Sequence, residues 1–159
     1  MPDDAVDFAA VAYREEGEWR MEEIDDDALA DLDALIDELQ RWPGDFGALG
    51  MVSIDDEFFL VVRVAGEDVR LLLSDVTAAT EWPLAREVVD ELEIPVPDDD
   101  DEQEPAGDVD IVEDLGLSAK DLAAMLDDYD LYPDELLGDI AHRLGFGRLF
   151  DRFVGAPTP

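Results

Sequence analysis

Three short apolar runs near the middle of the chain constrain its fold more than any other feature of the sequence. Residues 48–54, 57–64 and 69–73 read ALGMVSI, EFFLVVRV and VRLLL, and acidic or glycine turn residues separate them. This spacing predicts an antiparallel meander. Phe58–Val62 is apolar at every position, whereas a strand with one face in water alternates. Both faces of the predicted sheet must therefore be covered, by the C-terminal segment, a second copy or another protein.

The flanking sequence predicts a further hairpin and two helices. Two extended runs, Phe8–Arg14 and Glu18–Ile24, surround a Glu-Glu-Gly turn. Leucines recur at helical spacing over Leu29–Leu39, and the apolar positions of Leu84–Leu92 do the same behind Pro83. The predicted fold class is α+β, with a five-stranded antiparallel sheet in β-β-α-β-β-β-α order. Longin and roadblock domains, which are protein-docking platforms, have a similar order, although a shared order is weak support for a shared function.

An acidic segment divides the chain. Residues 97–108 read PDDDDEQEPAGD, a polar and self-repelling stretch that predicts an extended linker. Beyond it the pattern is helical, with Ser118 as an N-cap, Asp121 three residues later, and Gly145 as a helix terminator. We therefore predict an α+β domain over residues 1–96 and a helical C-terminal segment over residues 109–159.

Charge restricts the partners of this chain. It has 159 residues, of which 45 are acidic and 10 basic, and its formal net charge is −35. Such a surface repels phosphate backbones and favours basic partners, or it only keeps the protein soluble. We expect no direct nucleic-acid binding. The acidic N-terminus lacks a signal-peptide pattern and no apolar run is long enough to cross a bilayer, so we expect a cytoplasmic protein without membrane contact.

The sequence also argues against catalysis. There is no cysteine, so the thiolate ligands of a zinc-dependent deaminase are missing. The single histidine, His142, rules out a metal site built on two histidines, and no serine stands in a Gly-x-Ser-x-Gly motif. No glycine-rich phosphate-binding loop is present. We expect a protein that is not an enzyme and that needs no metal or cofactor.

Residues 74–83, SDVTAATEWP, form a neutral stretch in this acidic chain. Asp75, Thr77, Thr80 and Trp82 are candidate partner-binding residues, because a partner can approach here without facing a row of carboxylates. In the alternative interpretation they shape a turn, with Asp75 or Thr77 accepting backbone N–H groups and Thr80 capping the next helix. A pocket at this stretch would instead favour a small-molecule sensor or an uncharacterised enzyme.

The C-terminal helices supply a second group of candidates, Arg143, Arg148, Phe150 and Arg152. Three of the nine arginines of the chain lie within residues 143–152. Arginine and aromatic side chains dominate the energetics of protein interfaces. In the alternative interpretation the phenylalanines pack a terminal helix and the arginines pair with the acidic body.

The stretches LGMVSIDDEFFLVVRV, RLLLSDVTAATEWPLAREVVDELEIPVPDDDDE and DLYPDELLGDIAHRLGFG resemble the actinobacterial family of tRNA adenosine deaminase-associated proteins. The resemblance extends from about Phe8 to Val154 and carries over no catalytic residue. It implies an accessory protein, and the leading hypothesis is a non-catalytic protein that binds a tRNA-adenosine deaminase through its acidic surface. A homodimer through the apolar strands is a further alternative.

Overall fold

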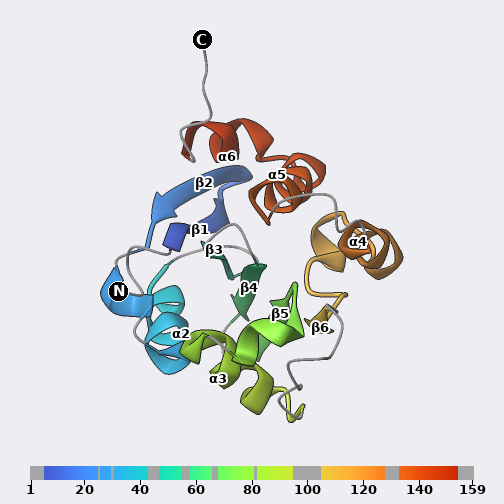
Figure 1. The fold of residues 1–159 in the computed structure, drawn as a ribbon. Helices are drawn as coiled ribbons and strands as arrows, with labels where there is room; N and C mark the ends of the chain where they lie inside the picture. The colour runs from blue at the N-terminus through green and yellow to red at the C-terminus, as the bar shows by residue number, and fades with distance from the viewer. Residues whose placement is uncertain are drawn as a thin grey trace.

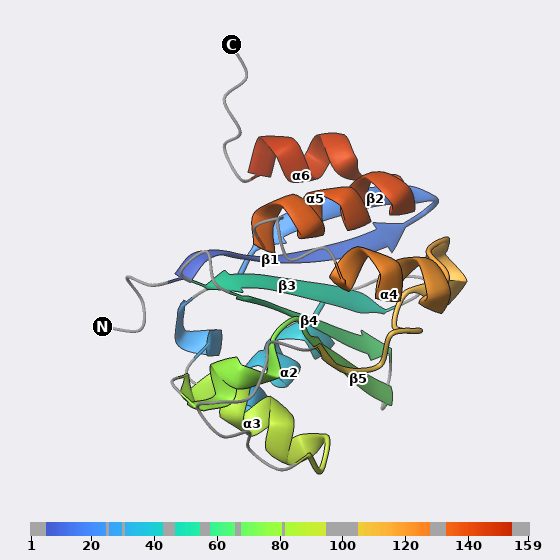
Figure 2. The same cartoon turned by 45° about the vertical axis from the view of Figure 1, so that its right-hand side comes forward.

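The computed structural model describes most of the chain, and the described residues are 6–24, 26–29, 31–42, 47–54, 58–65, 68–80, 82–94, 105–127 and 133–153. It is an α+β structure with three layers, a central sheet between two layers of helices (Figures 1 and 2). Within the described residues, no helix is both long enough and apolar enough to cross a membrane.

The central sheet is antiparallel and has the strand order β2-β1-β3-β4-β5-β6. Its strands are β1 (Val6–Glu15), β2 (Glu18–Glu23), β3 (Ala48–Ile54), β4 (Phe58–Ala65), β5 (Asp68–Leu73) and β6 (Ala106–Gly107). The prediction of an antiparallel sheet in an α+β fold is confirmed. The predicted number of five strands is wrong, because the sheet has six.

The sixth strand, β6, comes from the end of the predicted linker. Its two residues pair with Leu72 and Leu73 of β5. Gly107 adopts a φ of 115°, and a Cβ atom at this position would collide with the carbonyl oxygen of Leu71. Only glycine allows the chain to approach β5 this closely. Positions 97–104 of the predicted linker lie outside the described residues, and the division of the chain at residue 97 stays a prediction.

One helical layer packs on the first face of the sheet. It consists of the 3₁₀-helices η1 (Asp26–Leu29) and η2 (Val76–Thr80) and the α-helices α2 (Leu32–Gln40) and α3 (Pro83–Glu91). The N-cap residue Asp31 starts α2 by accepting a hydrogen bond from the amide of Ala34 at 2.7 Å. We call this part of the molecule the first layer.

The second face is covered by the C-terminal part of the chain. This second layer consists of the 3₁₀-helix η3 (Glu113–Leu115) and the α-helices α4 (Ala119–Leu126), α5 (Pro133–Leu144) and α6 (Gly147–Phe153). The amide of Asp121 donates to the Ser118 hydroxyl at 3.2 Å, which confirms the predicted cap of α4.

The two layers explain the unbroken apolar strands. In β4, Phe58 and Leu60 face the first layer, whereas Phe59 and Val61 face the second layer. All seven residues of β3 are buried. The expectation that both sheet faces are covered is thus confirmed, and the cover is the protein's own C-terminal segment. The apolar strands therefore do not require a second copy.

Candidate partner-binding surfaces

The stretch after β5 forms the 3₁₀-helix η2, and its polar side chains hold that turn together. The carboxylate of Asp75 accepts hydrogen bonds from the amide of Thr77 at 2.9 Å and from its hydroxyl at 2.6 Å. The Thr80 hydroxyl donates to the carbonyl oxygen of Thr77 at 2.8 Å. Asp75 therefore has the turn-forming role that the sequence suggested as an alternative. Partner contacts of these residues stay a prediction.

The prediction that Thr80 caps the next helix is wrong. Trp82 is the N-cap residue of α3, without a side-chain capping bond, and Pro83 occupies the first turn. Thr80 ends η2 instead. The ring of Trp82 lies 6.1 Å from that of Phe58, and its indole nitrogen is buried without a hydrogen-bond partner among the described residues. Trp82 is thus half-buried against the side chains that pack between the first layer and the sheet, and only part of its ring faces the surface.

The second group of candidates lies on α5 and α6. Arg143, Arg148 and Arg152 are exposed, whereas Phe150 is only 2% exposed. Phe150 packs beside Gly138 of α5, where an added Cβ atom would lie 3.3 Å from its ring. Its burial removes Phe150 from the residues that a partner can touch directly. The arginines remain available, since no ion pair joins them to a carboxylate in the part of the chain that the structure describes.

The two groups of candidates do not form one site. Val76, Ala78 and Ala79 of η2 belong to the core of the first layer, whereas Phe150 belongs to the core of the second. The sheet lies between them (Figure 2). A partner that contacts both groups has to reach around the sheet.

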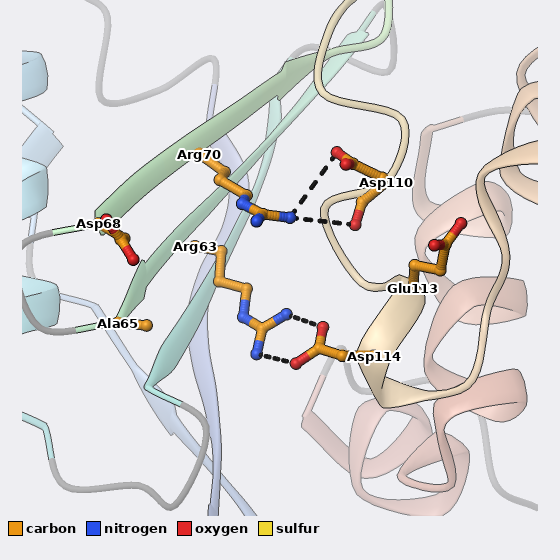
Figure 3. A pocket seen from close by; sticks show the side chains of 7 residues that line it. All are labelled: Arg63, Ala65, Asp68, Arg70, Asp110, Glu113 and Asp114. Atoms are coloured by element: carbon orange, nitrogen blue, oxygen red, sulfur yellow. Dashed lines mark hydrogen bonds and ion pairs between the residues drawn. The ribbon is translucent and has the colours of Figure 1, made fainter.

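A pocket of about 450 Å³ opens at one end of β4 and β5, beside the chain between β6 and η3. Figure 3 shows the side chains that line it, which are Arg63, Ala65, Asp68, Arg70, Asp110, Glu113 and Asp114. The pocket lies on the sheet face that carries the second layer, because Arg63 follows the alternation of Phe59 and Val61. It is therefore on the opposite face from η2, where the sequence suggested a pocket.

Arg63 is the structural centre of this pocket. Its side chain is 9% exposed and makes a two-point ion pair with the carboxylate of Asp114, in which one of the distances is 2.8 Å. It also donates to the carbonyl oxygen of Ile111 at 2.9 Å. The hydrogen bond from Arg63 lowers the pKa of Asp114, although partial burial opposes this shift. This charge pair ties the second layer to the sheet.

The sequence does not indicate this pocket directly, because the residues that line it are far apart in the chain. Arg63 and Arg70 lie directly opposite each other on β4 and β5. Two like charges in such a pair are unfavourable, and carboxylates of residues 110–114 offset them. One signal was visible, since Arg63 is the only charged residue within an otherwise apolar strand.

Ser74 and His142 are side chains of types that enzymes use in catalysis, and both have partners within the protein. The buried hydroxyl of Ser74 accepts a hydrogen bond from the amide of Phe59 at 2.8 Å. His142 is exposed and lies 3.3 Å from the carboxylate of Asp151. Across the described residues, no group of histidine and acidic side chains is arranged to hold a metal ion.

The two helical layers differ in charge. The described residues of the first layer, within 26–42 and 75–94, carry eleven carboxylates and two arginines. The described residues of the second layer, within 113–127 and 133–153, carry eight carboxylates, three arginines and one lysine, and four of those carboxylates and all three arginines lie in residues 133–153, which form α5 and α6. The first layer is therefore the more negative of the two outer surfaces.

Comparisons with known proteins agree on one family. The chain is 41% identical over 142 residues to protein Rv3753c of Mycobacterium tuberculosis, which covers 87% of this chain and 82% of that protein. No solved structure matches the chain significantly. The sequence profile of the Rv3753c-like tRNA adenosine deaminase-associated proteins matches residues 7–147. Since that match spans nearly the whole chain, the protein belongs to the family of Rv3753c-like tRNA adenosine deaminase-associated proteins.

Proposed function

We propose that this protein is a non-catalytic accessory protein that binds a tRNA adenosine deaminase through the acidic outer surface of its first layer. Family membership carries the proposal, because the family is described by its association with that enzyme. Eleven carboxylates and two arginines in the first layer supply the charge. An enzyme that acts on tRNA presents basic side chains to the phosphate backbone, and these are the natural complement of such a surface.

The same argument predicts competition with tRNA. A carboxylate-rich surface and a phosphate backbone attract the same arginine and lysine side chains. When the accessory protein occupies the tRNA-facing surface of the deaminase, tRNA binds less well. Addition of the protein to a deaminase assay should then raise the apparent KM for tRNA and leave kcat unchanged.

Binding should depend strongly on salt. The Debye length is about 10 Å at 0.1 M ionic strength and about 3 Å at 1 M, so exposed charges attract each other far less at high salt. We expect the two proteins to elute together from a sizing column at about 0.05 M salt and to separate at about 0.5 M. Separate elution at low salt would show that the docking proposal is wrong.

A matched pair of variants tests which surface binds. Asp33, Asp37 and Asp90 are exposed on α2 and α3, and their joint replacement by Asn should weaken binding about tenfold or more. The control replaces Asp121, Asp127 and Asp139 of the second layer, which are also exposed. The control has the same net charge, so it should bind like the natural protein. Equal weakening by both variants would mean that total charge, and not the first layer, determines binding.

A further inference from the structure

Two charged side chains of β5 line the pocket without a close partner. Asp68 and Arg70 are two residues apart, so they point to the same face of the sheet. The guanidinium of Arg70 reaches only Asp110, at 3.4 Å to its carbonyl oxygen and 3.7 Å to its carboxylate. The carboxylate of Asp68 has no hydrogen bond or ion pair within the described residues. Short contacts within the protein therefore account for Arg63 and Asp114, whereas Arg70 has only two long contacts and Asp68 has none within the described residues.

The charges of the pocket alternate across it. Figure 3 shows Arg63 and Arg70 in the middle, with Asp68 on one side and Asp110 and Glu113 on the other. Four carboxylates and two guanidinium groups line the pocket, so two negative charges are in excess. A simple anion would meet four carboxylates, and a simple cation would leave Arg70 without a closer acceptor. The lining suits a ligand with two cationic groups and one carboxylate.

We propose that this pocket binds a small basic α-amino acid of the arginine or lysine type. The α-carboxylate accepts hydrogen bonds from Arg70, and the α-ammonium group donates to Asp68. The cationic side chain extends toward Asp110 and Glu113, and Ala65 forms an apolar part of the wall. Arg63 keeps its bond to Asp114 and is not needed for the ligand. The volume of about 450 Å³ lies within the range of small-molecule sites.

Calorimetry with three related compounds tests each contact. L-arginine has all three charged groups, agmatine lacks the carboxylate, and N-acetyl-L-arginine lacks the α-ammonium charge. We expect saturable binding of L-arginine to the full chain, and binding of the other two that is weaker by about tenfold or more, since charge-assisted hydrogen bonds are the strong ones.

Two variants assign the contacts to residues. Arg70→Gln should remove the preference for L-arginine over agmatine, and Asp68→Asn should remove the preference over N-acetyl-L-arginine. Arg152→Gln and Asp139→Asn carry the same charge changes on α6 and α5, away from the pocket, and both preferences should persist in them. Circular dichroism confirms that each variant keeps its fold.

Two results would overturn the proposal. One is the absence of saturable L-arginine binding up to about 10 mM, a concentration at which even a weak specific site fills. The other is equal binding of L-arginine and agmatine, which would mark general attraction to an acidic protein. The site is separate from the docking surface, because the pocket and the first layer lie on opposite faces of the sheet. Failure here leaves the deaminase proposal intact.

Discussion

The first and second layers perform the same structural task with different outer surfaces. Each buries leucine, isoleucine, valine or phenylalanine side chains against one face of the same sheet. Their outward positions differ, since the first layer is dominated by carboxylates and α5–α6 nearly balances acids with arginines. Packing against the sheet determines only the inward side chains. The outward charge is not needed for this packing, and the difference between the layers is the feature on which the proposed docking surface rests.

The largest expected effect comes from opening a cavity in either core. Leu35 of α2 and Phe146 before α6 are both fully buried. Leu35→Ala should lower the free energy of unfolding by about 2–5 kcal/mol, and Phe146→Ala by about 3–5 kcal/mol. Urea unfolding followed by circular dichroism and tryptophan fluorescence measures both losses.

The same experiment tests whether the layers unfold together. Because both cores share one sheet, we expect one cooperative transition in both variants. If Phe146→Ala instead gives a separate early transition, the second layer unfolds alone, and the predicted division into residues 1–96 and 109–159 has a thermodynamic basis.

A smaller effect should come from the ion pair that joins the second layer to the sheet. Within its described residues the first layer has one ion pair, between the exposed Arg41 and the half-buried Glu38, whereas Arg63 of the second layer's pair is buried. Asp114→Asn weakens a two-point, charge-assisted contact to Arg63, and we expect a loss of about 1–3 kcal/mol at pH 7. Asp110→Asn is the control, because its exposed contact to Arg70 at 3.7 Å should cost less than about 1 kcal/mol.

The Asp114 effect should depend on pH. Arg63 lowers the pKa of Asp114 in the folded protein from its ordinary value of 3.8. A carboxyl group of this kind contributes stability above its unfolded pKa and loses that contribution as the pH falls through the folded pKa. The difference in stability between the natural protein and Asp114→Asn should be constant near neutral pH and shrink below about pH 4. A difference that persists unchanged at pH 2–3 would contradict the role of the charge.

The sequence predicted those parts of the fold that depend on neighbouring residues, such as a buried strand and a helix cap. The unbroken apolar run of Phe58–Val62 indicated a strand covered on both faces, and burial on both faces is what the structure shows. The Ser118 cap was also readable, because it needs only a hydroxyl at the right distance before a helix. The strand was readable from its unbroken apolar run, and the cap from two residues that are three positions apart in the chain.

Other parts depend on contacts that the sequence does not display. The strand β6 has two residues, too few for any periodic signal, and it forms because Gly107 fits against Leu71. Phe150 was a candidate for partner contact, with packing of the terminal helix as the alternative, and the structure buries it in the core of the second layer. The pocket needs the register that places Arg63 opposite Arg70, together with a segment forty residues farther along the chain.

The smallest effect concerns how a helix in each layer ends. The helix α3 is followed by Glu93 at a φ of 60°, and α5 by Gly145 at a φ of 106°. A left-handed conformation costs a residue with a side chain about 1 kcal/mol more than glycine. Glu93→Gly should therefore stabilise the protein by about 0.5–1 kcal/mol, and Gly145→Ala should destabilise it by about 1 kcal/mol or more, because a φ of 106° lies farther from the conformations open to a side chain. Glu93→Gln separates backbone from charge, because it removes the unfavourable carboxylate at a helix C-terminus but keeps the side chain. If Gln stabilises as much as Gly in urea unfolding, the cost at Glu93 is electrostatic, and the first layer loses stability to its own acidity where the second does not.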